Sequence, residues 1–329
     1  MDKLDMAIIR ELTGSILPPR RGFAPSYRQI SKKLGTSPGT LRNRINIMYK
    51  SEILLGSTVF PNPNLIGLKV AAYTVEIPNS KVKADLFQKL KLVEGVYAAH
   101  DFVGSRSWVV FFYKNEAELE RTHFLLNEIS GTAGFLTNLF FPPCPVSFTK
   151  SEAELILHLS KNALVSYAKL GKNLGIPVRT LKREMSRLVR ENMILSLPTV
   201  DYTAIEGCVP ADLLVFFEDN KARAEAVSKV LEIVMDHLIL ASMYDVVGMC
   251  SLVLPRVAST GELAARVKRI SGVKDAWVEI VSEHFMEGKQ FVKYIERQIS
   301  DESNQLVTII ESKNSANPAH IPRRVRNDV

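Results

Sequence analysis

Side chains able to read DNA bases follow a Ser-Pro pair near the N-terminus at helical spacing. Ser37 can accept hydrogen bonds from free backbone amides, and Pro38 removes an amide that would lack a helical partner, so the pair predicts a helix start. Arginine can form paired bonds to guanine, and asparagine can form them to adenine. Such side chains occur in the outward stripe of this helix, which is Gly39, Arg42, Asn43 and Asn46.

The opposite face of the same helix is apolar. Leu41, Ile45 and Met48 stand at i, i+4 and i+7, which predicts a buried stripe. A second set of polar residues flanks the outward stripe and is better placed for phosphates and register than for bases. This set, together with the capping residue, is Ser37, Thr40, Arg44 and Lys50.

Positive charge is concentrated around this helix. Eight Lys or Arg residues and no Asp or Glu lie between Arg20 and Ser51. An amphipathic helix with a solvated polar face is the alternative for any single helix of this kind. The acid-free cationic stretch favours a nucleic-acid interface instead.

Neighbouring elements must hold this helix in place. Apolar spacing from Leu4 to Leu12 predicts a supporting helix, and Ser26 to Gly35 predicts a short helix closed by a left-handed glycine. The stretch from Ile53 to Phe60, broken at Gly56, predicts two short strands that form a wing. Together these elements predict a winged helix-turn-helix.

The same unit occurs twice, because residues 27–67 align with residues 167–207 at a constant offset of 140 without a gap. In the second copy, Pro177 replaces the serine cap and Glu184 stands in place of Arg44. The second outward stripe has no side-chain amide and more charge, so we expect it to contact phosphates more than bases. A helix that has lost DNA binding and only packs is the alternative. The second stripe is Arg179, Lys182, Arg183 and Ser186.

A βαββαβ order follows each helix-turn-helix and predicts a ferredoxin-like domain. In the first half the segments are 68–77, 82–92, 96–103, 108–113, 117–129 and 135–141. In the second half they are 213–217, 222–234, 238–243, 250–254, 263–270 and 276–281. The predicted fold class is therefore α+β, with two winged helix-turn-helix domains alternating with two ferredoxin-like domains. The predicted boundaries are 1–62, 63–148, 149–204, 205–298 and a partly disordered C-terminal extension at 299–329, preceded by a helical pattern over 291–310.

The stretch from Ile30 to Ile45, with its Ser-Pro-x-Thr-aliphatic-x-x-Arg-Ile core, resembles the winged helix-turn-helix of the Lrp/AsnC family of prokaryotic transcription regulators. The resemblance implies a DNA-facing helix, at or near which lie Ser37, Thr40, Arg42, Asn43 and Arg44. A long insertion between Leu12 and Tyr27 departs from the family pattern.

The resemblance also implies that the ferredoxin-like domain assembles dimers through its sheet and often senses an amino acid near a glycine turn. The family usually has an acidic residue a few positions after that glycine, where Ser107 and Ser251 stand here, so a purely structural turn is an equal alternative. The candidate effector residues are Gly104, Ser105, Arg106, Ser107 and Gly248.

Composition bounds the remaining chemistry. The chain has 329 residues and a net charge of +7, which permits nucleic-acid binding without demonstrating it. Its three cysteines and six histidines show no ligand spacing, so we expect no metal, no disulfide framework and no cofactor. No apolar run is long enough to span a membrane, and we expect a cytoplasmic, nucleoid-associated protein.

The leading hypothesis is a sequence-specific transcription regulator, not an enzyme. Its expected partners are double-stranded DNA, a small effector such as an amino acid, and a second ferredoxin-like domain within the chain or on another chain. Siroheme decarboxylases, which are built on an Lrp-like architecture, give an enzymatic alternative. His100 lies in a strand-turn region but has no second histidine convincingly placed beside it. A protein-assembly module without DNA binding is the third interpretation.

Overall fold

The structure is a computed structural model that describes residues 2–13, 16–17, 27–145, 149–161, 165, 167–244, 246–286 and 296. The first helix-turn-helix is built from α1 (Lys3–Thr13), α2 (Tyr27–Lys33) and α3 (Pro38–Lys50). The second is built from α6 (Lys150–Lys161), α7 (Tyr167–Leu174) and α8 (Val178–Arg190). In both copies a glycine with positive φ, Gly35 at 64° and Gly175 at 67°, ends the middle helix.

The prediction that residues 53–60 form a two-stranded wing is wrong. Residues 54–61 form one strand, β2 (Leu54–Pro61), which pairs antiparallel with β7 (Ile194–Val200) of the other half rather than folding back on itself. Gly56 has a φ of 152° beside a register shift, so the break seen in the sequence is a bulge in one strand. The two halves of the chain are therefore joined through a shared two-stranded ribbon.

Both ferredoxin-like domains have the βαββαβ order expected from the sequence. The first contains β3 (Lys69–Glu76), α4 (Ser80–Leu90), β4 (Val96–Phe102), β5 (Arg106–Tyr113), α5 (Glu116–Ser130) and β6 (Phe135–Leu139). The second contains β8 (Val209–Phe217), α9 (Asn220–Val234), β9 (Leu238–Tyr244), β10 (Val247–Leu254), α10 (Ser259–Lys268) and β11 (Val273–Met286). Short 3-10 turns precede the first strand of each domain and follow α9, at η1 (Pro63–Ile66), η2 (Tyr202–Ala204) and η3 (Met235–His237).

One continuous sheet contains both domains, in the order β1-β9-β10-β8-β11-β4-β5-β3-β6 within the described residues. The strand β11 makes the junction, because its first part pairs with β8 and its end pairs with β4. At the far edge, β1 (Ile16–Leu17) runs parallel to β9. The N-terminal segment of the first half thus completes the sheet of the second half.

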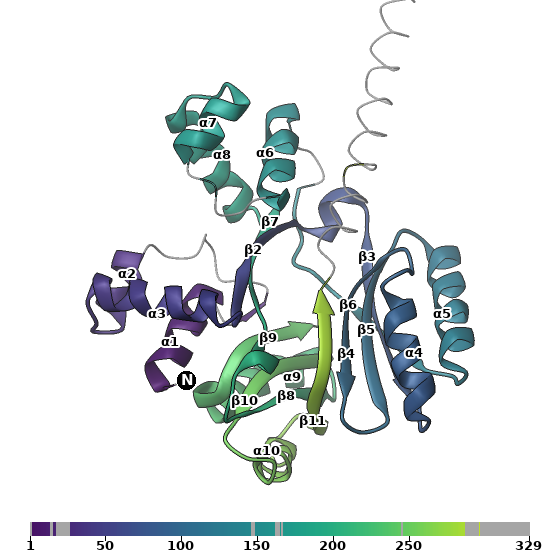
Figure 1. Cartoon of the computed structure of the whole chain (residues 1–329). Coiled ribbons are helices and arrows are strands. Elements are labelled where there is room, and N and C mark those ends of the chain that lie inside the picture. Colours follow the sequence, from purple (N-terminus) through teal and green to yellow (C-terminus); the bar gives the residue numbers. More distant parts are fainter. Residues whose placement is uncertain are drawn as a thin grey trace, which may run out of the picture.

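The sheet turns so that its two sections face each other (Figure 1). Strands β8, β9 and β10 run across the direction of β3, β4 and β5, with β11 at the corner. The helices α4 and α5 cover the outer face of the first section, and α9 and α10 cover that of the second. The inner faces pack together and form the largest core of the molecule.

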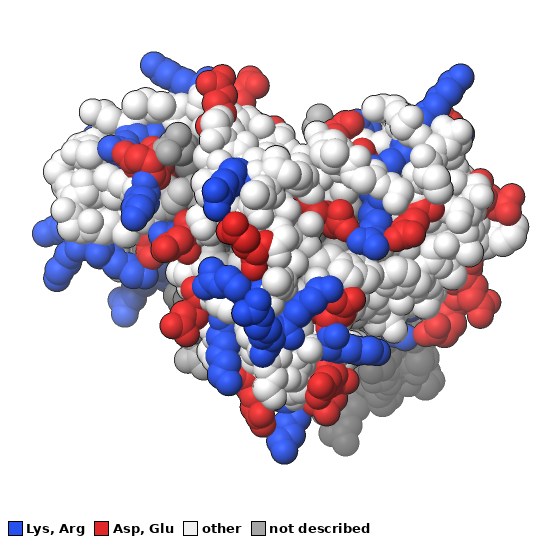
Figure 2. Space-filling model, turned by 90° about the horizontal axis from the view of Figure 1, so that it is seen from below, with Lys and Arg blue, Asp and Glu red and all other residues white. Residues whose placement is uncertain are grey.

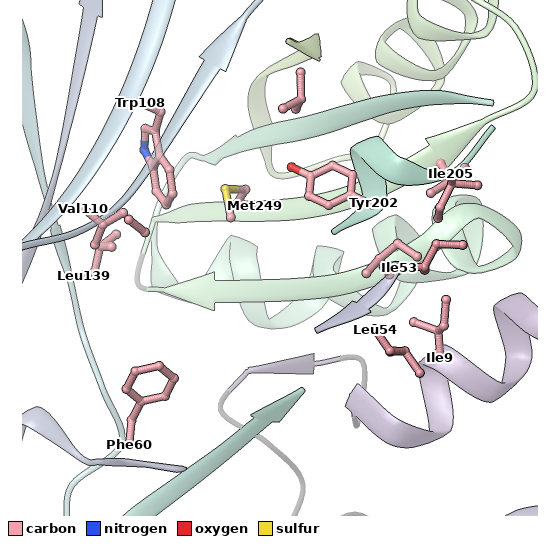
Figure 3. Close-up of a cluster of buried hydrophobic side chains, with 14 of the residues drawn as sticks. Ile9, Ile53, Leu54, Phe60, Trp108, Val110, Leu139, Tyr202, Ile205 and Met249 are labelled. Carbon is pink, nitrogen blue, oxygen red and sulfur yellow. The ribbon is translucent and has the colours of Figure 1, made fainter. Parts of the chain in front are cut away.

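Figure 3 shows this inner core. Trp108, Val110 and Leu139 of the first half lie on one side of Met249, and Tyr202 of the second half lies on the other. The core continues through Ile9 into the first helix-turn-helix, where it includes the buried face of α3. The second helix-turn-helix has a separate core made with parts of β2 and η1.

Several sequence predictions lie outside the described residues. These are most of the insertion between Leu12 and Tyr27, the helical pattern over 291–310 apart from position 296, and the C-terminal extension. Among the helices that the structure does describe, none is long and apolar enough to cross a membrane.

Candidate nucleic-acid interface and a buried histidine cluster

The helix α3 begins where the Ser-Pro pair predicts. The Ser37 hydroxyl accepts a hydrogen bond from the Thr40 amide at 3.0 Å and contacts the Thr40 hydroxyl at 2.9 Å. Pro38 is the first helical residue. This cap fixes the helix start and, with it, the rotation that faces each side chain inward or outward.

The inward stripe of α3 is fully buried, since Leu41, Ile45 and Met48 are each at most 2% exposed. The outward stripe is exposed at all four predicted positions: Gly39, Arg42, Asn43 and Asn46. Within the part of the chain that the structure describes, the three side chains of that stripe form no ion pair and no side-chain hydrogen bond. Their donors and acceptors are therefore available to a ligand.

Two flanking residues differ in their availability. Lys50 is exposed at the end of α3, as a phosphate contact requires. Arg44 was expected to contact phosphate, but its guanidinium lies 2.7 Å from the Asp2 carboxylate and 2.8 Å from that of Asp5. The hydrogen bonds to these carboxylates raise the pKa of Arg44. Arg44 thus fastens α3 to α1, and its charge is largely offset.

The helix α8 repeats the inner face of α3 with Leu181, Met185 and Leu188, each at most 2% exposed. Its Pro177 cap makes no side-chain hydrogen bond. The three predicted cations Arg179, Lys182 and Arg183 are exposed, and Lys182 lies over the ring of Tyr167 at 5.9 Å from the ring centroid. Neither Arg179 nor Arg183 has an ion-pair partner among the described residues.

The charge on one face of the molecule is visible in Figure 2. Lys and Arg side chains project from the left-hand edge of this view, where α2 and α3 lie. Another group of cations lies over α10, but acidic side chains surround that group. The cationic edge at α2 and α3 matches the acid-free stretch of the sequence.

The candidate effector turn of the first half is held by the protein's own side chains. The Lys83 ammonium donates to the carbonyl oxygens of Phe102 and Gly104, at 2.6 Å for Gly104, and lies 3.0 Å from the Asp101 carboxylate. The Ser107 hydroxyl donates to the same carboxylate at 2.9 Å. The polar groups that a small effector would bind here already have partners.

The other effector candidates also have structural contacts. Arg106 bridges Glu76 and Glu279 and lies over the Trp277 ring at 4.4 Å, so it ties the first half to β11. Ser105 is half-buried, and its carbonyl oxygen accepts from the Ile77 amide at 2.7 Å. In the second half, a Cβ added at Gly248 would stand 2.5 Å from the Met243 sulfur. A side chain at that position would have to displace the Met243 thioether.

A polar cluster that the sequence did not predict lies between the two sheet sections. His100 on β4 contacts the Asp212 carboxylate of β8 through Nδ1 at 2.5 Å. The Tyr202 hydroxyl donates to the other Asp212 oxygen at 3.0 Å and lies 3.2 Å from His100 Nδ1. Burial and the charge of Asp212 raise the pKa of Tyr202. Asp212 is fully buried, so this network satisfies its charge where water does not reach.

The expectation that no second histidine stands beside His100 is wrong. His284 is the register partner of His100 across the β11–β4 junction, with the ring centroids 5.7 Å apart. Its Nδ1 is buried and has no hydrogen-bond partner among the described residues. Burial, and then the neighbouring His100, lower the pKa of His284. The sequence signal is the absence of Gly, Pro, Asn and Asp between Val281 and Met286, which lets β11 continue past the predicted end.

The remaining titratable groups offer little chemistry. Cys250 is buried, and burial raises the pKa of its thiol, as it does less strongly for half-buried Cys144. Unactivated thiols of this kind are poor nucleophiles. No group of three or more His, Cys, Asp or Glu side chains in the described ranges is placed to hold a metal ion.

The sequence matches no family model. It is 31% identical over 105 residues to the HTH-type transcriptional regulator Ptr1 of Methanocaldococcus jannaschii, a match that spans 32% of this chain and 66% of that protein. It is 28% identical over 108 residues to the regulatory protein AsnC of Haemophilus influenzae, spanning 32% of this chain and 67% of that one. The matched segments are thus about two thirds of each regulator and one third of this chain.

A structural likeness extends over the whole chain. The siroheme decarboxylase NirDL, solved in complex with an iron-uroporphyrin III analogue, has a TM-score of 0.53 and 12% sequence identity, and the match covers 91% of this chain and 99% of that one. At this identity the likeness concerns the fold and not the chemistry. From the regulator matches and this full-length likeness, we conclude that the chain has the Lrp/AsnC-like fold, arranged in tandem along its whole length.

Proposed function

We propose that this protein is a DNA-binding transcription regulator of the Lrp/AsnC type, with α3 as the helix that reads bases. The observation that carries the proposal is the division of α3 into two faces. Leu41 and Ile45 are at most 1% exposed, whereas Arg42, Asn43 and Asn46 are exposed and have no partner within the described part of the chain. A helix of this kind can enter a major groove without unfolding anything.

The charge distribution supports the same interpretation. Arg28, Lys32 and Lys50 would supply contacts to phosphate, which give most of the affinity of a DNA-binding protein and make it fall with salt. Two further cations of α2 and α3 are paired within the protein, Lys33 with Glu11 and Arg44 with Asp2 and Asp5. Base contacts from Arg42, Asn43 and Asn46 would add discrimination. The polar groups of the Gly104 turn are bonded within the protein, so we do not extend the proposal to an effector at that site.

Selection of bound fragments from random duplex DNA, followed by fluorescence anisotropy on the selected sequence, tests this proposal. We expect a defined motif, and binding at least about tenfold weaker after the triple change Arg42→Ala, Asn43→Ala and Asn46→Ala. Lys229→Ala removes an exposed cation of α9 and is the matched control, with little expected effect. Absence of any duplex binding at low salt, or equal binding by the triple variant, would overturn the proposal.

A tetrapyrrole decarboxylase is the second candidate, because His100 and His284 adjoin between the sheet sections and a solved structure that matches over the whole chain is such an enzyme. The buried part of this cluster does not admit a tetrapyrrole in this conformation. His100 is 7% exposed, Tyr202 3% and Trp108 5%, whereas the His284 side chain is 16% exposed, so a macrocycle could reach His100 only if the two inner faces separated. The cost of opening this apolar core would be large.

Absorbance titration with iron-uroporphyrin III separates the two candidates. The proposed regulator gives no saturable spectral change, and its DNA binding is unaltered by the double change His100→Ala and His284→Ala if the variant stays folded. A saturable change that this double variant loses, with the Arg42, Asn43 and Asn46 variant unaffected, would favour the enzyme.

A further inference from the structure

We propose that one copy of this chain binds a complete operator with two unlike half-sites, one contacted by α3 and the other by α8, so that the operator has a direction. This inference rests on the proposed function and adds the stoichiometry and symmetry of the DNA site. It follows from how the two helices are related and how their outward side chains differ.

The pairing of β2 with β7 has an internal two-fold symmetry. With the offset of 140 between the halves, Leu197 corresponds to Ser57 and Pro198 to Thr58. Ser57 pairs with Pro198 and Thr58 pairs with Leu197. Each position thus meets the counterpart of the other, which is the rule for an isologous contact. A pseudo-two-fold axis passes through the centre of this ribbon.

The symmetry extends beyond that centre. Gly56 pairs with Thr199, the counterpart of Val59, and Val59 pairs with Ser196, the counterpart of Gly56. The reciprocal pairing ends at the register shift beside Gly56, where Leu54 pairs with Val200. Along this ribbon the two halves of one chain are arranged as the subunits of a two-fold dimer. The nine-stranded sheet is different, because β11 pairs with β4 while the counterpart strand β6 pairs only with β3 among the described residues.

Each DNA-facing helix enters its ribbon strand through the same turn. After α3, Glu52 has a φ of 58° and the Ile53 amide donates to the Met48 carbonyl at 3.0 Å. After α8, Asn192 has a φ of 56° and the Met193 amide donates to the Leu188 carbonyl at 2.7 Å. Because strands and turns correspond, the axis of the ribbon also relates α3 to α8.

Duplex DNA has local two-fold axes of its own, so a protein with two helices related by a two-fold axis contacts two half-sites whose separation follows the helical repeat. Both helices here belong to one chain. A single copy therefore supplies what a homodimer supplies in a symmetric regulator. The complex expected from this geometry contains one chain per operator.

The half-sites differ because the outward side chains differ. Asn43 and Asn46 of α3 correspond to Arg183 and Ser186 of α8, and Arg42 corresponds to Lys182. Asparagine can make the paired contact to adenine, whereas arginine reaches guanine or phosphate and lysine acts as a point charge. An adenine-reading half-site is expected under α3 alone. The operator is therefore not a palindrome.

A graft tests this inference with all substitutions at exposed positions. The variant Lys182→Arg, Arg183→Asn and Ser186→Asn gives α8 the side chains of Arg42, Asn43 and Asn46, with Arg179 kept where α3 has Gly39. The reciprocal control carries Arg42→Lys, Asn43→Arg and Asn46→Ser. Sequence selection should give an asymmetric motif for the unmodified protein and a palindromic motif for the graft. The reciprocal control should lose the adenine-rich half-site.

Measured affinities sharpen the test. Changing one adenine in the α3 half-site should weaken binding about tenfold, whereas restoring the second half-site to palindromic symmetry should not improve it. Inserting about five base pairs between half-sites should weaken binding strongly, because it rotates them by half a turn. Equal melting temperatures confirm that the graft folds.

Failure of this inference is distinct from failure of the proposed function. Duplex binding with a palindromic motif, with two chains per operator, or with one half-site only would overturn the directional operator while the regulator assignment stands. Absence of binding to any duplex would overturn both.

Discussion

The helices α3 and α8 have matching inner sides and different outer sides. On the inner side, Leu41 and Leu181 are fully buried, and the other two inward positions of each helix are at most 2% exposed. On the outer side Asn43 corresponds to Arg183, and both are exposed. Packing fixes the inward residues, whereas Arg42, Asn43, Asn46 and Arg183 form no ion pair and no side-chain hydrogen bond within the described protein. The difference between the halves therefore concerns what each helix binds and not how it folds.

The two helices also differ in what lies beneath them. The buried face of α3 is continuous with the core between the sheet sections, and α1 packs on β9 of the other half. The buried face of α8 belongs to a smaller, separate core. The helix with the amide side chains is thus the one fastened to the body of the molecule. A base-reading helix benefits from this arrangement, since direct readout depends on fixed geometry.

The largest effect on stability should come from truncating one buried side chain in each of the two cores. Leu41→Ala and Leu181→Ala each remove a fully buried side chain, so each should cost about 2–5 kcal/mol of local or global stability. Hydrogen exchange should distinguish them. Leu41→Ala should increase exchange in α1–α3 and in the inner strands β8–β10, whereas Leu181→Ala should do so only in α6–α8. The same pattern for both variants would contradict the contrast between the cores.

A smaller effect should separate base reading from phosphate contact. Asn43→Ala should reduce discrimination between the selected operator and a scrambled duplex by about 1–3 kcal/mol. Arg183→Ala, the matched position on α8, should weaken binding to both duplexes evenly and lower the slope of log affinity against log salt by about 1. Competition binding at several salt concentrations measures both. Equal discrimination in the two variants would contradict the proposal that α3 reads bases and α8 mainly contacts phosphate.

The helix caps provide a third comparison. Ser37→Ala removes the hydroxyl that accepts from the Thr40 amide and should cost about 1 kcal/mol. Pro177 makes no cap hydrogen bond, so Pro177→Ser should instead stabilise the second helix-turn-helix, by less than about 1 kcal/mol. Urea denaturation followed by circular dichroism gives the sign of each change. Destabilisation by the Pro177 substitution would show that the α8 cap is already satisfied.

The smallest expected effect is a pH dependence at the sheet junction. Burial and His100 lower the pKa of His284, so the unfolded chain binds more protons than the folded one below the ordinary histidine pKa of about 6.5. Stability should fall as pH decreases from neutrality through that window. His284→Gln should reduce this fall in melting temperature. The hydrogen bond from Lys268 lowers the pKa of Asp275, so the stability lost when Asp275 is protonated belongs to a lower pH range. An unchanged profile between pH 7 and 5 would exclude His284 as a source.

Local patterns predicted the elements well, because their causes are local. The Ser37-Pro38 cap, the left-handed Gly35 and the βαββαβ order depend on residues close in sequence. The pairing of β2 with β7 was not predictable in this way, since it joins residues about 140 apart. The partners of Arg44 were missed for the same reason, because Asp2 and Asp5 reach it only when α1 packs on α3.

The site was predicted unevenly for a related reason. The outward stripe of α3 follows from helical periodicity, and all four positions are exposed. The cluster of His100, Asp212, Tyr202 and His284 draws one residue each from four elements, which no single sequence window contains. Only an extended β11 places His284 beside His100.

The most direct test of the account is the binding of full-length protein to its selected duplex, before and after the changes Arg42→Ala, Asn43→Ala and Asn46→Ala. The account predicts salt-dependent, sequence-preferring binding by the unmodified protein, and loss of the preference, with residual non-specific binding, in the triple variant. Undiminished sequence preference in that variant, or no duplex binding by the unmodified protein, would contradict it.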